Sequence, residues 1–211
     1  PLHVQGVNVL GTSPDSINQA EDRHQFSALL DKLQVDQPEW KELVTMSGAT
    51  SFAERVGYPV LVRPSFVLSG AAMSVASTEE QLVMCLQNAK DVSQDEPIVI
   101  SKYILNAKEI EFDAVAKHGE ILNYAISEHV ENAGVHSGDA TLVLPAQKLY
   151  VQTVRKVKQI AQKIARALHI SGPVNIQFLA KGNLVKVIGM TTHLFNLFLI
   201  FSAHISSRQF P

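Results

Sequence analysis

The sequence of 211 residues lacks the features of secreted, membrane-spanning and nucleic-acid-binding chains. Its one cysteine excludes an internal disulfide framework and suits a reducing compartment. The net charge of −2 gives no electrostatic footprint for nucleic acid or an anionic membrane surface. The apolar run HLFNLFLIFSAHI is shorter than the roughly 20 residues that span a bilayer, and Asn and His interrupt it. We therefore expect no nucleic-acid partner and no membrane partner.

Several motifs that bind nucleotides or metals are also missing. The sequence contains no GxxxxGK[ST] and no GxGxxG, so neither a P-loop nor a Rossmann turn is available to hold phosphates. It has no HExxH and no paired CxxC, which argues against a conventional zinc site. Cys85 lies between Met84 and Leu86 on an apolar helical face, a position that favours core packing over a nucleophile.

Acidic residues are absent from the C-terminal segment. From Gly189 to Pro211 the chain has no Asp, Glu or Lys, although it holds four of the nine Phe. A Lys/Val/Ile strand runs directly into this segment, and the end of a strand is a usual place for catalytic carboxylates. The N-terminus lacks the charged start and apolar core of a signal peptide. Because it begins with Pro rather than Met, we expect the chain to be a piece of a longer protein.

The apolar periodicity that is present predicts an α+β fold. Ser13 as N-cap and Pro14 at the first position start a helix that continues to Leu33. Polar loops and Gly turns separate the other elements, and we expect two lobes with a boundary near 95–97 and a ligand in the cleft between them. The further helices are expected at 48–56, 77–92 (with a Ser77/Glu80 capping box) and 147–168, the strands at 7–11, 58–64 and 97–104, and the hairpins at 107–132 and 172–188, turning at His118-Gly119 and Gly182-Asn183.

The loop SEHVENAGVHSGDA, 127–140, is the most unusual polar stretch. A hydrolytic triad of His136, Ser137 and Asp139 is disfavoured, because residues so close in sequence rarely converge around one another. A metal site from His129, Glu131 and His136 is a second interpretation. The third is a hairpin loop whose polar groups cap the backbone.

Two arginines and an acidic strand face are ambiguous from the residues alone. Arg63 ends a buried strand before a Ser/Gly loop, where it could reach phosphate oxygens, or it is a surface residue at a strand end. Arg23 could be a helix-surface partner of Asp22. Glu109, with Glu111 and Asp113 at alternating positions, could be solvated or could bind a ribose hydroxyl or a metal.

Five segments in order resemble the ATP-grasp domain of carbamoyl-phosphate synthetase, in its second, carbamate-phosphorylating half and its eukaryotic form. They are GTSPDSINQAEDRHQF, YPVLVRPSFVLSGAAM, EIEFDAVA, ISEHVENAGVHSGDATL and GPVNIQFLAK, and the resemblance covers residues 9–188. It implies an ATP-grasp fold with antiparallel sheets in two lobes. It also implies a division into the end of a preceding domain (1–12), an N-terminal lobe (13–96), a C-terminal lobe (97–188) and a tail outside the family (189–211).

The resemblance assigns roles to residues that the bare sequence left open. Arg23 and Arg63 would contact the ATP phosphates as catalytic residues, Glu109 would hold the ribose hydroxyls, and Gln177 would bind metal. The remaining nucleotide contacts that the resemblance implies are the Ser69-Gly70 loop over the phosphates, the adenine slot of Lys102, Tyr103 and Ile104, and the nucleotide loop of Gly134, Val135, His136 and Ser137.

The implied reaction is phosphoryl transfer from ATP to carbamate with Mg²⁺, or Mn²⁺ in its place. The implied partners are ATP, carbamate or bicarbonate, the remaining synthetase domains and a glutaminase portion. The parent would be cytoplasmic, or mitochondrial if it is the urea-cycle type rather than the pyrimidine type.

The resemblance fails after Ile188. The family continues with Glu, Asn and Arg where this chain has Gly189, Thr191 and His193. Neither Gly nor Thr replaces a carboxylate toward Mg²⁺. We therefore expect weak nucleotide binding without useful ATP turnover. A non-catalytic nucleotide-binding or interaction module from a truncated isoform is the alternative function, and a metal-dependent hydrolase is a remote third.

Overall fold

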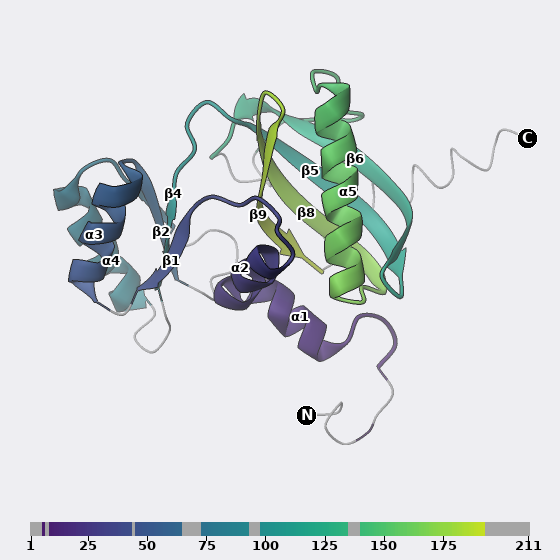
Figure 1. The fold of residues 1–211 in the computed structure, drawn as a ribbon, viewed down its shortest axis with the longest axis horizontal. Coiled ribbons are helices and arrows are strands. Elements are labelled where there is room, and N and C mark those ends of the chain that lie inside the picture. The colour runs from purple at the N-terminus through teal and green to yellow at the C-terminus, as the bar shows by residue number, and fades with distance from the viewer. Residues whose placement is uncertain are drawn as a thin grey trace, which may run out of the picture.

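The computed structural model describes residues 6, 9–43, 45–64, 73–92, 98–134 and 140–192. Their elements form two lobes, each an antiparallel sheet with helices against it (Figure 1). The smaller sheet has the strand order β1-β4-β2-β3, and the larger has the order β7-β6-β5-β8-β9. The expected α+β class with two antiparallel sheets is confirmed.

The smaller lobe packs α3 and α4 against its four strands. Its core includes Phe52, Val60, Leu82 and Ile100, which are almost completely buried. Cys85 is partly buried against this core, as its apolar neighbours in sequence suggest. The elements are β1 (Trp40–Leu43), α3 (Met46–Val56), β2 (Val60–Pro64), β3 (Ser74–Ala76), α4 (Glu79–Val92) and β4 (Ile98–Lys102).

The larger lobe places one long helix, α5, across one face of its sheet (Figure 1). In β5 the residues Ile110, Phe112 and Ala114 alternate toward this helix and are fully buried. Ala20 and Phe26, from the two N-terminal helices, pack into the same core. The elements are α1 (Pro14–Glu21), α2 (Arg23–Lys32), β5 (Lys108–Lys117), β6 (Glu120–Asn132), β7 (Leu142–Val143), α5 (Val151–Ala167), β8 (Gly172–Lys181) and β9 (Leu184–Thr191).

Both predicted hairpins are confirmed, with β5 paired to β6 and β8 paired to β9. His118 and Gly119 have φ values of 50° and 83°, the positive pair that a tight hairpin turn requires. Gly182, with φ 60°, starts the second turn. The second hairpin continues to Thr191, so regular pairing extends past the residue where the expected lobe ends.

The single helix expected from Ser13 to Leu33 is wrong, because the chain breaks at Asp22. That residue has ψ 114°, and its carboxylate accepts hydrogen bonds from the backbone N–H groups of His24 and Gln25. Asp22 is therefore the N-cap of α2 rather than an ion-pair partner of Arg23. The strand expected at 7–11 is also wrong in its described part, since residues 9–11 lie in no strand.

Two helix starts differ from expectation, each because of local hydrogen bonds. In α4 the cap is Thr78 rather than Ser77, because Gln81 donates its N–H to Thr78 Oγ1 at 3.3 Å. Gln81 Oε1 in turn accepts the N–H of Ser77 at 2.8 Å. Helix α5 starts at Val151 rather than at residue 147, because Glu128 Oε1 accepts the N–H groups of Gln147 and Lys148 before it.

The two short strands β1 and β7 were not expected. The lobe boundary expected at 95–97 lies outside the described residues. The strand that follows it, β4, is a central strand of the smaller sheet. No helix in the described part of the chain is long and apolar enough to cross a membrane.

Candidate functional site

The face of the larger sheet that points away from α5 is polar. The strand register places Glu111 of β5 beside Ser127 of β6 and Gln177 of β8, and places Gln177 beside Gly189 of β9. A second row contains Asp113, Asn175 and Thr191, with the same order of strands. These side chains are buried, except for those of Gln177 and Thr191. The acidic face of β5, formed by Glu109, Glu111 and Asp113, is therefore buried rather than solvated.

Four side chains on this face form a buried hydrogen-bond network. His129 Nε2 lies 3.1 Å from Glu111 Oε1, and both side chains are at most 1% exposed. Asn175 Nδ2 donates to Glu111 Oε2 at 3.1 Å and to Asp113 Oδ1 at 2.9 Å. The two carboxylates are thus tied to one amide and one imidazole.

The environment of His129 favours its protonated form. Burial lowers the pKa of His129, but the hydrogen bond that His129 donates to Glu111 and the charges of Glu109, Glu111 and Glu131 outweigh it, so the net pKa is raised. The interpretation of His129, Glu131 and His136 as a metal site is not supported by the described residues, among which no group of three or more His, Cys, Asp or Glu could hold a metal ion; His136 lies outside them.

Arg23 and Arg63 meet in a small recess between the lobes, although they come from different elements. Arg23 is the first residue of α2 and Arg63 lies in β2, and the recess is lined also by Trp40, Ser101 and Ile188. Its volume of about 10 Å³ admits roughly one water. Burial lowers the pKa of Arg23. Burial and the nearby Arg23 charge lower the pKa of Arg63 to about 9, so Arg63 is still cationic at neutral pH.

The contacts of the two guanidiniums differ. Arg23 Nη1 donates to the backbone oxygen of Ile188 at 3.0 Å. Arg63 Nε is buried and has no hydrogen-bond partner among the described residues. An unpartnered, buried guanidinium nitrogen beside a second cation is costly, and such an arrangement is typical of an anion site. Arg63 is half-buried with its Nε fully buried, which does not favour the interpretation of Arg63 as a surface residue.

The residues expected at the adenine and ribose positions gather around one backbone turn. Tyr103 Oη donates to Ala133 O at 3.2 Å, and Gly134 N–H donates to Glu109 Oε2 at 3.4 Å. Gly134 has φ 112°, and a Cβ added there would overlap Tyr103 Oη, so only glycine fits. The structure thus brings together Tyr103, Glu109 and the start of the nucleotide loop.

Lys102 makes contacts that hold the lobe together. Its Nζ donates to the backbone oxygens of Gly57 at 2.8 Å and Tyr58 at 3.1 Å, which ties β4 to the end of α3. Ile104 is half-buried in the connection from β4 to β5. The predictions for Ser69, Gly70, Val135, His136 and Ser137 lie outside the described residues.

The side chains at the expected metal position do not fit a magnesium ion. Gln177, the implied ligand, lies beside Gly189, and its Oε1 is 3.1 Å from the point where a Cβ of residue 189 would be. Among the described residues there is no group of three or more His, Cys, Asp or Glu that could hold a metal ion. A hard divalent cation requires several oxygen ligands with negative charge, and the end of β9 supplies none.

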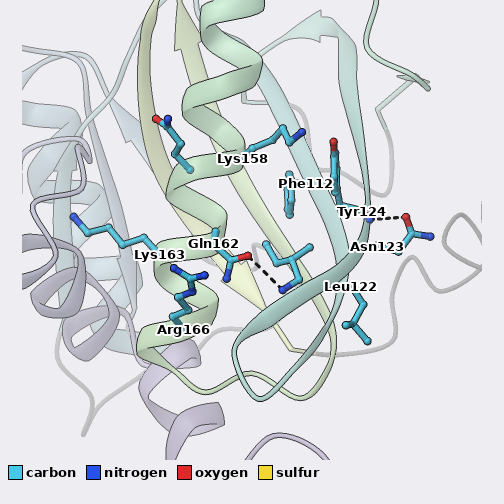
Figure 2. Close-up of a pocket in the computed structure, with 10 residues that line it drawn as sticks. Phe112, Leu122, Asn123, Tyr124, Lys158, Gln162, Lys163 and Arg166 are labelled. Atoms are coloured by element: carbon cyan, nitrogen blue, oxygen red, sulfur yellow. Dashed lines mark hydrogen bonds between the residues drawn. The ribbon is translucent and has the colours of Figure 1, made fainter.

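A much larger cavity than this recess is on the opposite side of the sheet. It is an open groove of about 650 Å³ between α5 and β6, with Phe112 and Tyr124 in its apolar part (Figure 2). The two rings stack with centroids 5.2 Å apart, and Lys158 Nζ lies 4.6 Å from the Tyr124 ring centroid. Because α5 separates this groove from the two arginines, it is a different surface from the candidate site.

Two antiparallel lobes with a cationic recess between them define the ATP-grasp class, and comparison with solved structures supports this. An Aspergillus clavatus carboxyaminoimidazole ribonucleotide synthase, solved with ATP, superposes with a TM-score of 0.80 at 18% identity, over 92% of this chain and 50% of that one. The biotin carboxylase domain of a Hydrogenobacter thermophilus 2-oxoglutarate carboxylase, solved with MgADP and bicarbonate, has a TM-score of 0.77 at 20% identity, over 92% and 44%.

The chain belongs to the family described as the carbamoyl-phosphate synthase L chain, ATP binding domain, whose model matches residues 22–195. It is 59% identical over 187 residues to the multifunctional protein URA2 of Saccharomyces cerevisiae, covering 89% of this chain and 8% of that protein. It is 54% identical over 188 residues to the mitochondrial carbamoyl-phosphate synthase [ammonia] of Rattus norvegicus, covering 89% and 12%. The chain thus spans about a tenth of the length of these relatives.

Proposed function

We propose that this chain binds ATP between its lobes, with the phosphates against the small recess that Arg23 and Arg63 line, as the ATP-binding portion of a carbamoyl-phosphate synthase. In the intact parent this portion would belong to the half that phosphorylates carbamate, together with the remaining synthetase domains and a glutaminase portion or subunit. A cytoplasmic parent would be of the pyrimidine type, and a mitochondrial one of the ammonia type. Membership of the family and its ATP-grasp fold support the proposal.

The observation that carries the proposal is the pair of half-buried arginines that face the same recess. Arg23 and Arg63 line one recess, where burial lowers the pKa of both and the charge of Arg23 lowers that of Arg63 further. Arg63 Nε has no hydrogen-bond partner in the described part of the chain. A polyphosphate would give both cations counter-charge and would satisfy the unpartnered donor.

The rest of the nucleotide would extend toward Tyr103 and Glu109. Glu109 is 6% exposed, and it already accepts the N–H of Gly134, which leads into the proposed nucleotide loop. Carboxylate oxygens are good acceptors for the two hydroxyls of a ribose. The adenine would lie against the segment from Lys102 to Ile104, whose main chain is held by the contacts of Lys102 and Tyr103.

We further propose that this chain alone does not turn over ATP at a useful rate. A magnesium ion, held in the family by residues at the positions of Gln177, Gly189 and Thr191, would supply counter-charge for the phosphates. Here Gly189 and Thr191 stand where carboxylate and amide ligands are expected, so a non-catalytic nucleotide-binding module is the second candidate function. The donor set around Gln177 favours this second candidate for the isolated chain.

The test is a calorimetric titration of the chain with ATP, in buffer with Mg²⁺ and in buffer with EDTA. We expect saturable binding in at least one buffer, and a loss of at least about tenfold in affinity for Arg63→Met, which is worth about 1.4 kcal/mol. The same substitution should leave the free energy of unfolding unchanged or raise it, because it removes a buried unpartnered charge.

Arg55→Met is the matched control, since Arg55 is exposed and paired with Glu39. It should change neither the affinity nor, beyond about 0.5 kcal/mol, the stability. Absence of ATP binding in both buffers would contradict the binding proposal. Carbamate-stimulated release of ADP during the titration with Mg²⁺ would contradict the proposal of inactivity.

A further inference from the structure

The position where the family places a metal-binding acid is occupied in this chain by a cation. An ideal Cβ built on Gly189 would lie 2.9 Å from Arg23 Nη1 and 3.6 Å from Arg23 Nη2. The guanidinium therefore packs directly over the glycine, on the polar face of the larger sheet. It is anchored there by its hydrogen bond to Ile188 O, in the strand that carries Gly189.

The absence of a side chain at residue 189 is what allows this packing. The same Cβ would lie 3.1 Å from Gln177 Oε1, so Arg23 and Gln177 together fill the space above the glycine. Any larger residue would push the end of the Arg23 side chain away. A carboxylate at residue 189 would instead form an ion pair with Arg23 and would neutralise its positive charge.

Arg23 and Arg63 are the two positively charged side chains that line the recess. No ion pair to either guanidinium occurs within the described residues, whose salt bridges involve other groups. Two acids on the same face, Glu111 and Asp113, form hydrogen bonds with His129 and Asn175. On α1, Glu21 accepts a hydrogen bond from Thr192 Oγ1.

Two guanidiniums carry the same charge as one magnesium ion, but they are part of the protein. A divalent cation entering beside Gln177 would meet the Arg23 guanidinium, and like charges at about 4 Å repel each other by several kcal/mol near a protein surface. We infer that the chain binds the polyphosphate of a nucleotide in its metal-free form, with the Arg23 guanidinium over Gly189 supplying positive charge where the family has a metal-binding acid. This inference rests on the proposed nucleotide site and specifies the ionic form of its ligand.

The experiment compares the affinity for ATP in EDTA with that in excess Mg²⁺, by calorimetry on the full 211-residue chain. We expect binding in EDTA to be at least about threefold tighter, because MgATP carries two fewer negative charges toward the two arginines. Gly189→Glu should lower the affinity in EDTA at least about tenfold, and its binding should become tighter when Mg²⁺ is added.

The control variant is Leu184→Glu, which adds the same carboxylate at an exposed position of the same strand. It should keep the preference for metal-free ATP. If Gly189→Glu does not give a cooperative thermal transition, Arg23→Gln replaces it and should remove the preference for EDTA. Binding of ATP by the wild-type chain that requires Mg²⁺ would overturn this inference and leave the proposed function standing, whereas absence of binding in both buffers would overturn the proposed function itself.

Discussion

At the scale of single residues, the buried pair of His129 and Glu111 gives the fold a specific dependence on pH. The raised pKa of His129 means that the folded state binds its proton more tightly than the unfolded chain, in which the value is about 6.5. The stabilisation is therefore complete below that value and is lost as the pH rises through the raised pKa of the folded state. We expect the difference in unfolding free energy between wild type and His129→Gln to be larger at pH 6 than at pH 8, measured by urea denaturation.

Glu111→Gln tests whether the Glu111 carboxylate causes this pH dependence. It keeps the size of the side chain and replaces the charged hydrogen-bond acceptor of His129, the largest influence that raises its pKa, with a neutral amide. The pH dependence of its stability should lie close to that of His129→Gln. Equal destabilisation by His129→Gln at both pH values would show that the imidazole acts only through packing.

The candidate site was predictable from the sequence where a residue carries its own signal. Arg23, Arg63 and Glu109 are named by the resemblance, and the structure places all three on the walls of the interlobe recess or of the turn at Gly134. The network of His129 and Asn175 was missed, because its members are far apart in sequence and the alternation of acids in β5 alone did not distinguish burial from solvation. Only the register of β5 with β6 and β8 brings them together.

At the scale of elements, the β5–β6 hairpin is held against α5 through its turn. A Cβ on Gly119 would lie 2.8 Å from Arg166 Cα and 3.2 Å from Ala165 O, which are backbone atoms of the helix. Gln162 Nε2 also donates to Gly119 O at 2.8 Å. We expect Gly119→Ala to lower the free energy of unfolding by at least about 2 kcal/mol, since it adds a steric clash to the cost of φ 83°.

Gly182→Ala separates these two effects in the same urea-unfolding experiment. Gly182 also has a positive φ, of 60°, but a Cβ there would meet nothing within 4 Å. Gly182→Ala should lower the free energy of unfolding only by the backbone cost of a positive φ at alanine, about 1 kcal/mol. Equal losses in the two variants would argue that the contact with α5 contributes nothing.

The elements themselves were largely predictable, because most carry a regular apolar period. The hairpins, α3, α4 and α5 appear within a few residues of their expected positions. The break at Asp22 was not predicted, since the apolar stripe continues across it and only the cap geometry reveals two helices. Strands β1 and β7 are short, and they form because neighbouring strands offer free edges, which a local pattern does not contain.

At the scale of the whole molecule, the site depends on both lobes. The smaller lobe contributes Arg63 and Ser101, and the larger lobe contributes Ile188, with Arg23 from the packed α2. Figure 1 shows α2 at the junction of the two sheets. The sequence predicts a cleft between two lobes. It does not predict that Gly189 in β9 leaves room for the Arg23 guanidinium and so determines the charge in this cleft.

A ligand that bridges the two arginines should therefore couple the motions of the lobes. Openings that separate β2 from β9 would expose the bound polyphosphate, so ATP at a hundredfold excess over its Kd should slow those openings by up to about a hundredfold, or about 2.7 kcal/mol.

Hydrogen–deuterium exchange measured with and without ATP in EDTA should show protection in peptides from both strands. The groove between α5 and β6 should exchange at the same rate in both conditions, because it lies on the other face of the sheet. Arg63→Met should remove the protection of β2 and β9 together, and protection confined to one lobe in the wild-type chain would mean that the nucleotide does not span the recess.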